Sequence, residues 1–286
     1  MVIKKSRTQL PLWASSLKEY NLSSIKYNFS TKIIDIPLAL YTDSITYNYL
    51  QKKSLKKTKS NKDKIKIYMR VINKKEFYSK KPKFYKGKNG NLYFKSFTHS
   101  GFINPDSLEG FFNLKSSKHS LSTFYFILRS FSSIFKLFVL HSSCIIYKNK
   151  AYLFFGKSGS GKSTIAKKFK RKFTMLDDEA NYIAFKNNNF NVYLPFFHSG
   201  SKKDSQDLFY KIKAVYLLKH HKENLIKLIS LNEKLNEIWY NNICEKLLGK
   251  KENERKMDLL LKFISSVDIN ELSFRKKCDF EKIVFK

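Results

Sequence analysis

The amino-acid sequence predicts an α/β protein in two parts, with a small β-rich domain over residues 1–118 and an α/β domain over residues 119–286. Before residue 118, short apolar runs alternate with polar residues in the period of a strand. From residue 119 the apolar spacing changes to that of a helix, and strand-like and helical segments then follow one another. A glycine-rich octapeptide, 156–163, lies between an apolar run and a helical stretch. These observations place a strand–loop–helix unit at the centre of the second domain.

Three short strands are expected in the first domain, over residues 32–40, 65–72 and 91–98. In the second of these strands Ile65, Ile67 and Met69 alternate with Lys, Tyr and Arg, which is the pattern of a half-buried strand. Residues 51–64 are polar, rich in Lys and without apolar periodicity, so we expect a solvated loop there. An electrostatic docking arm is the alternative interpretation of the same stretch.

The second domain is expected to begin with an amphipathic helix and to continue as alternating strands and helices. The expected strands cover residues 137–147, 151–155, 173–176, 182–185, 190–194 and 214–218. The expected helices cover residues 119–137, 162–172, a segment that starts at residue 230, and 252–266. The first two strands are separated only by the polar residues 148–150, so we expect a hairpin. Ser230 and Glu233 form a capping-box pattern at the start of the third helix.

The composition is strongly basic and excludes a disordered polycation. The 286 residues include 56 Lys plus Arg and 23 Asp plus Glu, a formal net charge of +33. A hydrophobic content of 42% and 26 Phe residues are enough for a packed core. The charge is compatible with nucleic acid, an acidic membrane surface or an acidic substrate. Because nearly all of the basic residues are Lys, and Arg is preferred for contacts to phosphates and bases, we favour a compositional bias and expect no specific nucleic acid.

The cysteine and hydropathy patterns exclude several classes of protein. The three cysteines are far apart and include no C-x-x-C pair, so neither a disulfide framework nor a structural zinc site is expected. This usage fits a reducing compartment, and we expect a cytoplasmic protein. The first 30 residues show no secretory signal, and no stretch has 18 uncharged apolar residues. A membrane span is therefore not expected.

The octapeptide 156–163 matches the phosphate-binding pattern G-x-x-x-x-G-K-[ST] in full. Glycines at its first, fourth and sixth positions allow positive φ angles and leave room for a ligand against the backbone. Backbone N–H groups of such a loop and of the helix after it point at phosphates, Lys162 supplies a positive charge, and the Ser163 hydroxyl can bind Mg²⁺. We expect ATP and Mg²⁺ here. The expected nucleotide contacts are Gly156, Lys157, Ser158, Gly159, Ser160, Gly161, Lys162, Ser163 and Thr164.

Two adjacent aspartates follow the loop in the sequence. Asp177 and Asp178 end a short strand 21 and 22 residues after Gly156. In an α/β sheet this position lies at the edge that carries the phosphate loop. One carboxylate would bind Mg²⁺ and the other would accept a proton from an attacking hydroxyl, although a solvated turn between strands is the simpler alternative. His141 lies in an apolar run before the loop and, from the residues alone, has the pattern of an ordinary core histidine.

These segments, taken in order, resemble the catalytic core of the HPr kinase/phosphorylase family. The resemblance consists of the His-Ser-Ser strand at 141–143, the loop Gly156 to Thr164, and the pair Asp177-Asp178, and it extends over about residues 105–286. It is closer to diverged bacterial relatives that have a phosphoenolpyruvate-carboxykinase-type nucleotide fold with a mixed sheet. The resemblance implies that His141, Lys162 and the two aspartates are catalytic, and that Asp177, Asp178 and Ser163 hold the metal.

The resemblance implies an ATP-dependent kinase that phosphorylates a Ser or Thr hydroxyl of a small protein or peptide, and it leaves a homo-oligomer open. The chain departs from the family between Ala180 and Lys222, where it has neither Glu nor Arg. The family has an acidic and Arg-containing signature downstream of the loop. A nucleotide-binding module or ATPase without kinase activity is therefore the alternative hypothesis. A nucleic-acid or membrane-surface binder that uses residues 51–88 is a third one.

Overall fold

The computed structural model describes residues 24–34, 36–52, 65–72, 83–132, 134–169, 172–194, 208–241, 250–275 and 281–285. Among these residues the chain forms two compact units, of which the first ends at Phe131 and the second begins at Ser132. This division assigns helix α3 (Ser120–Ser130) to the first unit, whereas the sequence pattern assigned the same stretch to the second domain. Each unit is described separately below.

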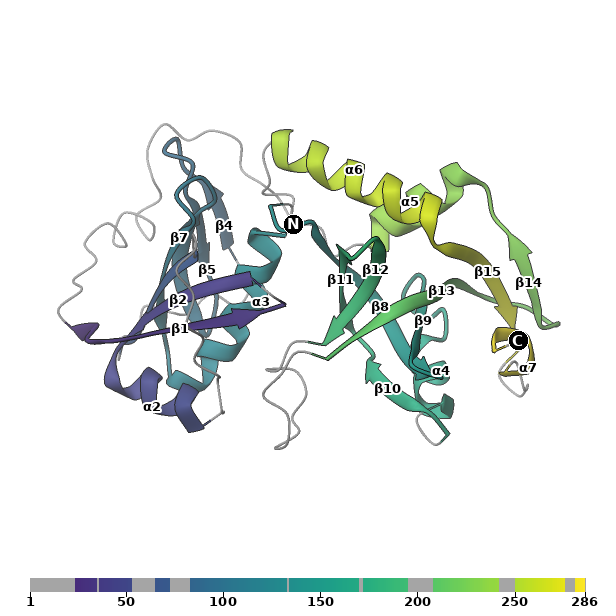
Figure 1. Cartoon of the computed structure of the whole chain (residues 1–286), viewed down its shortest axis with the longest axis horizontal. Helices are drawn as coiled ribbons and strands as arrows, with labels where there is room; N and C mark the ends of the chain where they lie inside the picture. The colour runs from purple at the N-terminus through teal and green to yellow at the C-terminus, as the bar shows by residue number, and fades with distance from the viewer. Residues whose placement is uncertain are drawn as a thin grey trace. The chain divides into compact units, whose positions relative to one another are not determined.

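The first unit holds a seven-stranded mixed sheet with the order β1-β2-β3-β7-β6-β5-β4 (Figure 1). Its strands are β1 (Tyr27–Ile33), β2 (Ile36–Thr42), β3 (Ile65–Val71), β4 (Lys83–Lys86), β5 (Leu92–Lys95), β6 (His99–Asn104) and β7 (Glu109–Leu114). Strand β3 runs parallel to β2 and to β7, and the other neighbours are antiparallel. Helix α2 (Ser44–Lys52) lies against β3, and α3 lies against β6.

The sequence pattern of the first unit is confirmed in β3 and is wrong at β1 and β2. In β3, Ile65, Ile67 and Met69 are buried and Lys66 is exposed, as the alternation predicts. The strand expected over residues 32–40 is two antiparallel strands, because Ile34 has a φ of 52° and turns the chain. Of the loop expected over residues 51–64, the first two residues end helix α2, and 53–64 lie outside the described residues.

One face of this sheet carries a row of aromatic side chains in register across six strands. Neighbouring rings in the row have centroids 4.4 to 6.1 Å apart, and the closest pairs are stacked. The row consists of Tyr41, Tyr68, Phe111, Phe102, Tyr93 and Tyr85. Cross-strand aromatic pairs stabilise a sheet by roughly 0.2–1 kcal/mol each. Because each ring lies against its neighbour on the next strand, we interpret the row as support for the sheet.

The second unit is built on an eight-stranded mixed sheet. Its strands are β8 (Leu137–Tyr147), β9 (Lys150–Phe155), β10 (Thr174–Asp177), β11 (Ala180–Lys186), β12 (Asn189–Leu194), β13 (Leu208–His220), β14 (Leu225–Leu228) and β15 (Asp268–Phe274). Their order is β10-β8-β11-β12-β13-β15-β14, and β9 pairs with both β8 and β13. Strands β9, β13 and β15 are parallel, and the remaining pairs are antiparallel. The α/β class with a mixed sheet is therefore as expected.

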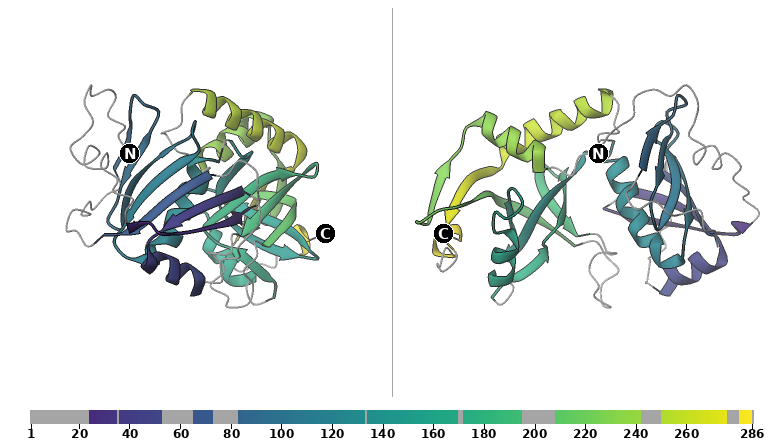
Figure 2. Two further views of the ribbon diagram at one scale, coloured as in Figure 1. Left: turned by 60° about the vertical axis from the view of Figure 1, so that its left-hand side comes forward. Right: turned by 180° about the vertical axis from the view of Figure 1, so that it is seen from behind.

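Helices cover both faces of this sheet (Figures 1 and 2). Helices α5 (Leu231–Asn241) and α6 (Lys250–Ser266) pack on one face, where Ile238 and Phe263 join the buried side chains of the strands. Helices α4 (Lys162–Phe169) and α7 (Glu281–Val284) pack on the other face through Ile165 and Val284. The alternation of β9 explains this arrangement, because Leu153 faces the first cluster and Phe154 the second.

The elements around the glycine-rich loop agree with the sequence pattern except at their ends. Strands β8 and β9 form the expected hairpin, in which Lys148 and Asn149 have φ values of 47° and 56°. The helix expected over residues 119–137 ends at Ser130, because the chain turns before β8 and Lys136 has a φ of 51°. Helix α4 begins at Lys162 as expected, and its described part ends at Phe169.

Candidate functional site

The loop that joins β9 to α4 has a backbone that requires glycine at three positions. Gly156, Gly159 and Gly161 have φ values of 146°, 81° and 102°, in the region that side chains disfavour. Gly161 also lacks space, since a Cβ atom there would lie 2.5 Å from Cζ of Phe274. Nothing lies within 4 Å of the corresponding position at Gly159. The loop therefore combines a tightly packed end at Gly161 with an open apex at Gly159.

Lys162 is the first residue of α4 and lies folded over the loop. Its side chain is mostly buried, and its Nζ atom donates hydrogen bonds to the carbonyl oxygens of Gly156 at 2.6 Å and Lys157 at 3.2 Å. Burial lowers the pKa of the Lys162 ammonium group. The Ser143 hydroxyl donates to the Lys162 carbonyl at 3.3 Å, which ties the start of α4 to β8. The positive charge is thus held beside the backbone that precedes the helix.

The side chains of Ser163 and Thr164 are exposed at the N-terminus of α4. This terminus combines unpaired helical N–H groups with the positive end of the helix dipole, which favours a bound anion. The Ser163 hydroxyl and the carboxylates of Asp177 and Asp178 are oxygen ligands of the kind that Mg²⁺ prefers. A phosphate-bound Mg²⁺ needs only one or two protein ligands of this kind. The donor set therefore fits Mg²⁺, although within the described residues no group of three or more His, Cys, Asp or Glu side chains could hold a metal.

Strand β8 and the β10–β11 bend form one flank of the loop. In the register of the sheet, Ser142 is opposite Phe155, the last residue before the loop, and His141 is opposite Ala180. His141 is exposed, but partial burial lowers its pKa, and the charge of Lys162 lowers it further while Glu179 acts in the opposite direction. These electrostatic effects mean that the structure brings His141, Lys162 and Glu179 into one neighbourhood.

The two aspartates of the pair have different environments. Oδ1 of Asp177 accepts hydrogen bonds from the N–H groups of Glu179 at 2.7 Å and Ala180 at 2.8 Å. This carboxylate closes the bend between β10 and β11, a common role for Asp in turns. Asp178 and Glu179 lie in the bend itself and are exposed. The sequence pattern treated the two aspartates as equivalent, whereas the structure uses Asp177 to shape the backbone that presents Asp178.

The end of β13 forms the other flank of the loop and includes a residue that the sequence pattern did not select. Nε2 of His220 lies 2.8 Å from the carbonyl oxygen of Gly159. His220 belongs to no recognisable motif of the sequence. A signal was nevertheless present, because a strand was expected over 214–218 and His220 follows it by two residues. In the structure Leu217 is opposite Phe155, so the next three residues extend to the level of the loop.

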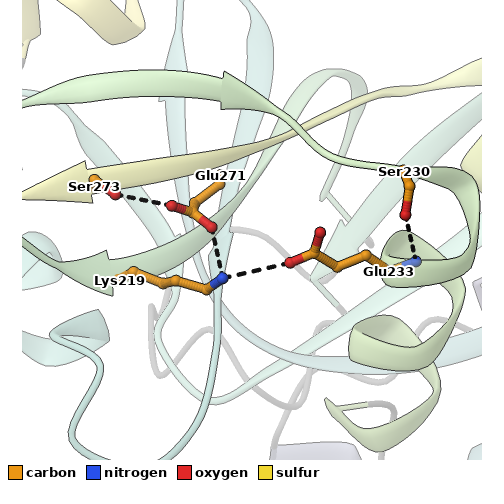
Figure 3. A network of polar contacts seen from close by, with 5 residues as sticks. All are labelled: Lys219, Ser230, Glu233, Glu271 and Ser273. Atoms are coloured by element: carbon orange, nitrogen blue, oxygen red, sulfur yellow. Dashed lines mark hydrogen bonds and ion pairs between the residues drawn. The ribbon is translucent and has the colours of Figure 1, made fainter.

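A polar network lies beside this flank, on the face of the sheet that carries α5 (Figure 3). Nζ of Lys219 lies 2.6 Å from Oε2 of Glu271 and 3.4 Å from Oε1 of Glu233, and the Ser273 hydroxyl donates to Glu271 at 2.9 Å. Burial would raise the pKa of Glu271, but the hydrogen bonds from Lys219 and Ser273 outweigh it and hold the pKa below its ordinary value. The network connects β13, β15 and the first turn of α5.

The capping box at the start of α5 is formed in one direction. The Ser230 hydroxyl accepts a hydrogen bond from the N–H group of Glu233 at 3.2 Å, as expected. The Glu233 carboxylate was expected to reach back to the Ser230 backbone, but it lies against Lys219 (Figure 3). The reason is tertiary, because a nearby ammonium group attracts a carboxylate more strongly than a backbone N–H does.

Comparisons with known proteins give little further information. No family model matches the chain, and no curated protein matches it. Among solved structures, the chain is similar to the HPr(Ser) kinase/phosphatase from Coxiella burnetii, with a TM-score of 0.26 and 8% sequence identity. That match covers 48% of this chain and 84% of the other. A likeness at this TM-score identifies neither a fold family nor a function, so the candidate site stands on its own geometry.

One further property concerns membranes. Among the helices of the described ranges, none is both long enough and apolar enough to cross a bilayer.

Proposed function

We propose that this protein binds ATP with Mg²⁺ at the loop 156–164 and transfers the γ-phosphoryl group to a Ser or Thr hydroxyl of a small protein or peptide. The observation that carries the proposal is the backbone of the loop, with three glycines at positive φ between a buried strand and a helix that begins at Lys162. Such a loop binds phosphates because its N–H groups and the helix dipole converge on an anion.

In this proposal Lys162 neutralises charge on the β- and γ-phosphates. Its present hydrogen bonds are to the neutral carbonyl oxygens of Gly156 and Lys157, and they can be exchanged for stronger contacts to charged phosphate oxygens. Ser163 and Asp177 would hold Mg²⁺, and Asp178 would serve as the base. The metal ion would supply charge neutralisation on the phosphates. The proposed loop thus provides most of the electrostatic stabilisation that phosphoryl transfer needs.

The acceptor would approach from the flank made by β8 and the β10–β11 bend. Asp178 would take the proton of the acceptor hydroxyl, and the oxygen of that hydroxyl would form a bond to the γ-phosphorus. The bond between the γ-phosphorus and the β–γ bridging oxygen would break at the same time, so that ADP leaves. Partial burial and the charge of Lys162 lower the pKa of His141 from its ordinary value, which favours the neutral imidazole. A neutral imidazole beside Lys162 can orient the acceptor or a phosphate oxygen by hydrogen bonding. The motif resemblance to HPr kinases favours a hydroxyl acceptor.

The proposal is tested by separating ATP binding from transfer. We expect Lys162→Ala to weaken ATP binding by at least tenfold in calorimetry, whereas Lys167→Ala on the exposed face of the same helix leaves it unchanged. We expect Asp178→Asn to bind ATP normally but to reduce transfer to acceptors, measured by phosphoproteomics, by roughly 10²-fold or more. Transfer that persists in the Lys162→Ala, Asp178→Asn double variant would contradict the kinase proposal.

The alternative function, an ATPase or nucleotide-binding module without an acceptor, has one specific observation in its favour. The chain has no Glu and no Arg between Ala180 and Lys222. Hydrolysis of ATP by the wild-type protein, with no phosphorylated product in a broad acceptor screen, would favour this alternative. In that case Asp178→Asn is expected to reduce hydrolysis, because the same carboxylate would orient the attacking water.

A further inference from the structure

We infer that His220 is a positioning residue for the loop 156–163. Its side chain holds the peptide group between Gly159 and Ser160 in an orientation that keeps the carbonyl oxygen of Gly159 away from the proposed phosphate. The inference rests on the proposed function. It concerns a residue that is 61 positions away from its partner in the sequence and that belongs to a different strand.

The peptide group between Gly159 and Ser160 is held at both ends. Its carbonyl oxygen lies 2.8 Å from Nε2 of His220, and its N–H group donates to the carbonyl oxygen of Lys157 at 3.0 Å. A carbonyl oxygen only accepts hydrogen bonds, so Nε2 of His220 must carry the proton. If this peptide group turned over, the carbonyl oxygen would change sides and could face the phosphates, whose negative charge it would repel.

Within the loop, Gly159 is the position where a hydrogen bond from another strand restricts the backbone most. A Cβ atom there would meet nothing within 4 Å, whereas one at Gly161 would lie 2.5 Å from Cζ of Phe274 and 3.4 Å from Cε1 of His220. Glycine without close neighbours has the largest conformational freedom, so ordering this apex costs the most entropy. A hydrogen bond formed before the ligand arrives removes part of that cost from binding.

His220 is itself held from the opposite face of the sheet. Successive residues of a strand point to opposite faces, so Lys219 and His220 act on different sides of β13. On one side Lys219 is bound by the carboxylates of Glu271 and Glu233 (Figure 3). On the other side the ring of His220 lies 5.5 Å, centroid to centroid, from the ring of Phe274. The network therefore fixes the strand end from which His220 reaches the loop.

The test compares His220→Ala, His220→Gln and His221→Ala in the full-length protein. Gln carries an N–H donor at about the reach of Nε2, and His221 is an exposed neighbour whose Nδ1 accepts from the Glu223 N–H group at 3.1 Å. We expect His220→Ala to weaken ATP binding in calorimetry by about three- to tenfold, the effect of one hydrogen bond. In the absence of ATP, hydrogen exchange of the segment 156–164 should be faster in His220→Ala than in the wild-type protein. His220→Gln should recover most of both effects, and His221→Ala should show neither.

Each outcome separates this inference from the proposed function. If the wild-type protein binds ATP and His220→Ala binds it equally well, the inference is wrong and the proposed function stands. If the wild-type protein does not bind ATP, the proposed function is wrong and the inference falls with it. If His220→Gln and His220→Ala are equally impaired, or exchange in strand β8 accelerates as much as in the loop, His220 has a general structural role and the inference is also wrong.

Discussion

Two glycines of the phosphate loop differ in the reason why they must be glycine. Gly159 and Gly161 both have positive φ values, of 81° and 102°. A side chain at Gly159 would have free space, but at Gly161 it would overlap the ring of Phe274. A substitution at Gly159 therefore measures the cost of backbone strain alone, and one at Gly161 measures backbone strain together with overpacking.

We expect Gly159→Ala to lower the free energy of unfolding by about 1–2 kcal/mol, the cost of a left-handed conformation for Ala. Gly161→Ala should lower it by about 1–3 kcal/mol more, because a buried ring must also move. Urea unfolding of both variants measures the difference. Equal losses in the two variants would contradict the packing of Phe274 against Gly161.

His141 provides a pH-dependent prediction at the same scale. Its folded-state pKa is lowered from 6.5, first by partial burial and then by the charge of Lys162. The unfolded chain therefore binds more protons below about pH 6.5, and the contribution of His141 to stability falls as the pH drops from there through the folded-state pKa. At pH 7 the imidazole is neutral.

An NMR titration of the imidazole should show a midpoint below 6.5. The substitution Lys162→Met should raise that midpoint, because it removes a positive charge, and Glu179→Gln should lower it, because it removes a negative one. A midpoint at or above 6.5 in the wild-type protein, or no response to Lys162→Met, would show that His141 does not lie beside the loop lysine.

At the scale of elements, two hairpins of the second unit have the same turn with different residues. The β8–β9 turn contains Lys148 and Asn149, with φ values of 47° and 56°, and the β11–β12 turn contains Asn187 and Asn188, with 51° and 58°. Two-residue turns with positive φ at both positions favour Asn and Gly. Lys148 is the unfavourable residue, and it lies in the hairpin that leads into the phosphate loop.

We expect Lys148→Asn to raise the free energy of unfolding by about 0.5–1 kcal/mol and the reciprocal change Asn187→Lys to lower it by a similar amount. Thermal unfolding at matched pH gives the sign of both changes. Lys148 is exposed, and its Nζ atom lies 5.3 Å from the centroid of the Tyr147 ring, so loss of this weak cation–π contact would offset part of the gain. Changes of the same sign in the two variants would mean that the turns are not equivalent.

At the scale of the whole molecule, the net charge of +33 and the glycine-rich loop 156–163 are separate features that would bind different ligands. Residues 51–88 contain 16 basic and 2 acidic residues, so 14 of the 33 net charges lie in 38 residues of the N-terminal part. The proposed phosphate contacts use Lys162 and the backbone N–H groups of the loop, and they need none of these charges. Polyanion binding and ATP binding should therefore be separable.

Replacement of the lysines in 51–64 by Gln is expected to leave the ATP affinity unchanged. The same variant should bind a labelled single-stranded oligonucleotide more weakly, with a smaller dependence of affinity on salt, because fewer counterions are released. Fluorescence anisotropy at several salt concentrations measures this slope. Oligonucleotide binding that is strong, steeply dependent on salt, lost in the variant and unaffected by ATP would favour the nucleic-acid hypothesis over a compositional origin of the charge.

Local patterns predicted the elements near the site because their causes are local. The hairpin of β8 and β9, the start of α4 at Lys162 and the burial alternation of β3 all follow from residues within a few positions of one another. One error occurred at a turn whose residue type carries no local signal. The strand expected over residues 32–40 is divided by a turn at Ile34, and an apolar β-branched residue is no sequence signal for a positive φ.

What the sequence determined by itself is the backbone of the glycine-rich loop 156–163 and the start of α4 at Lys162, since a few consecutive residues shape both. The tertiary structure decided what surrounds it. Asp177 closes a bend while Asp178 is exposed, because the bend spans two strands that pair with β8. His220 meets Gly159 because β13 runs parallel to β9 and extends past it. Sheet register brings together residues far apart in the chain, and no pattern within a short stretch of sequence specifies that register.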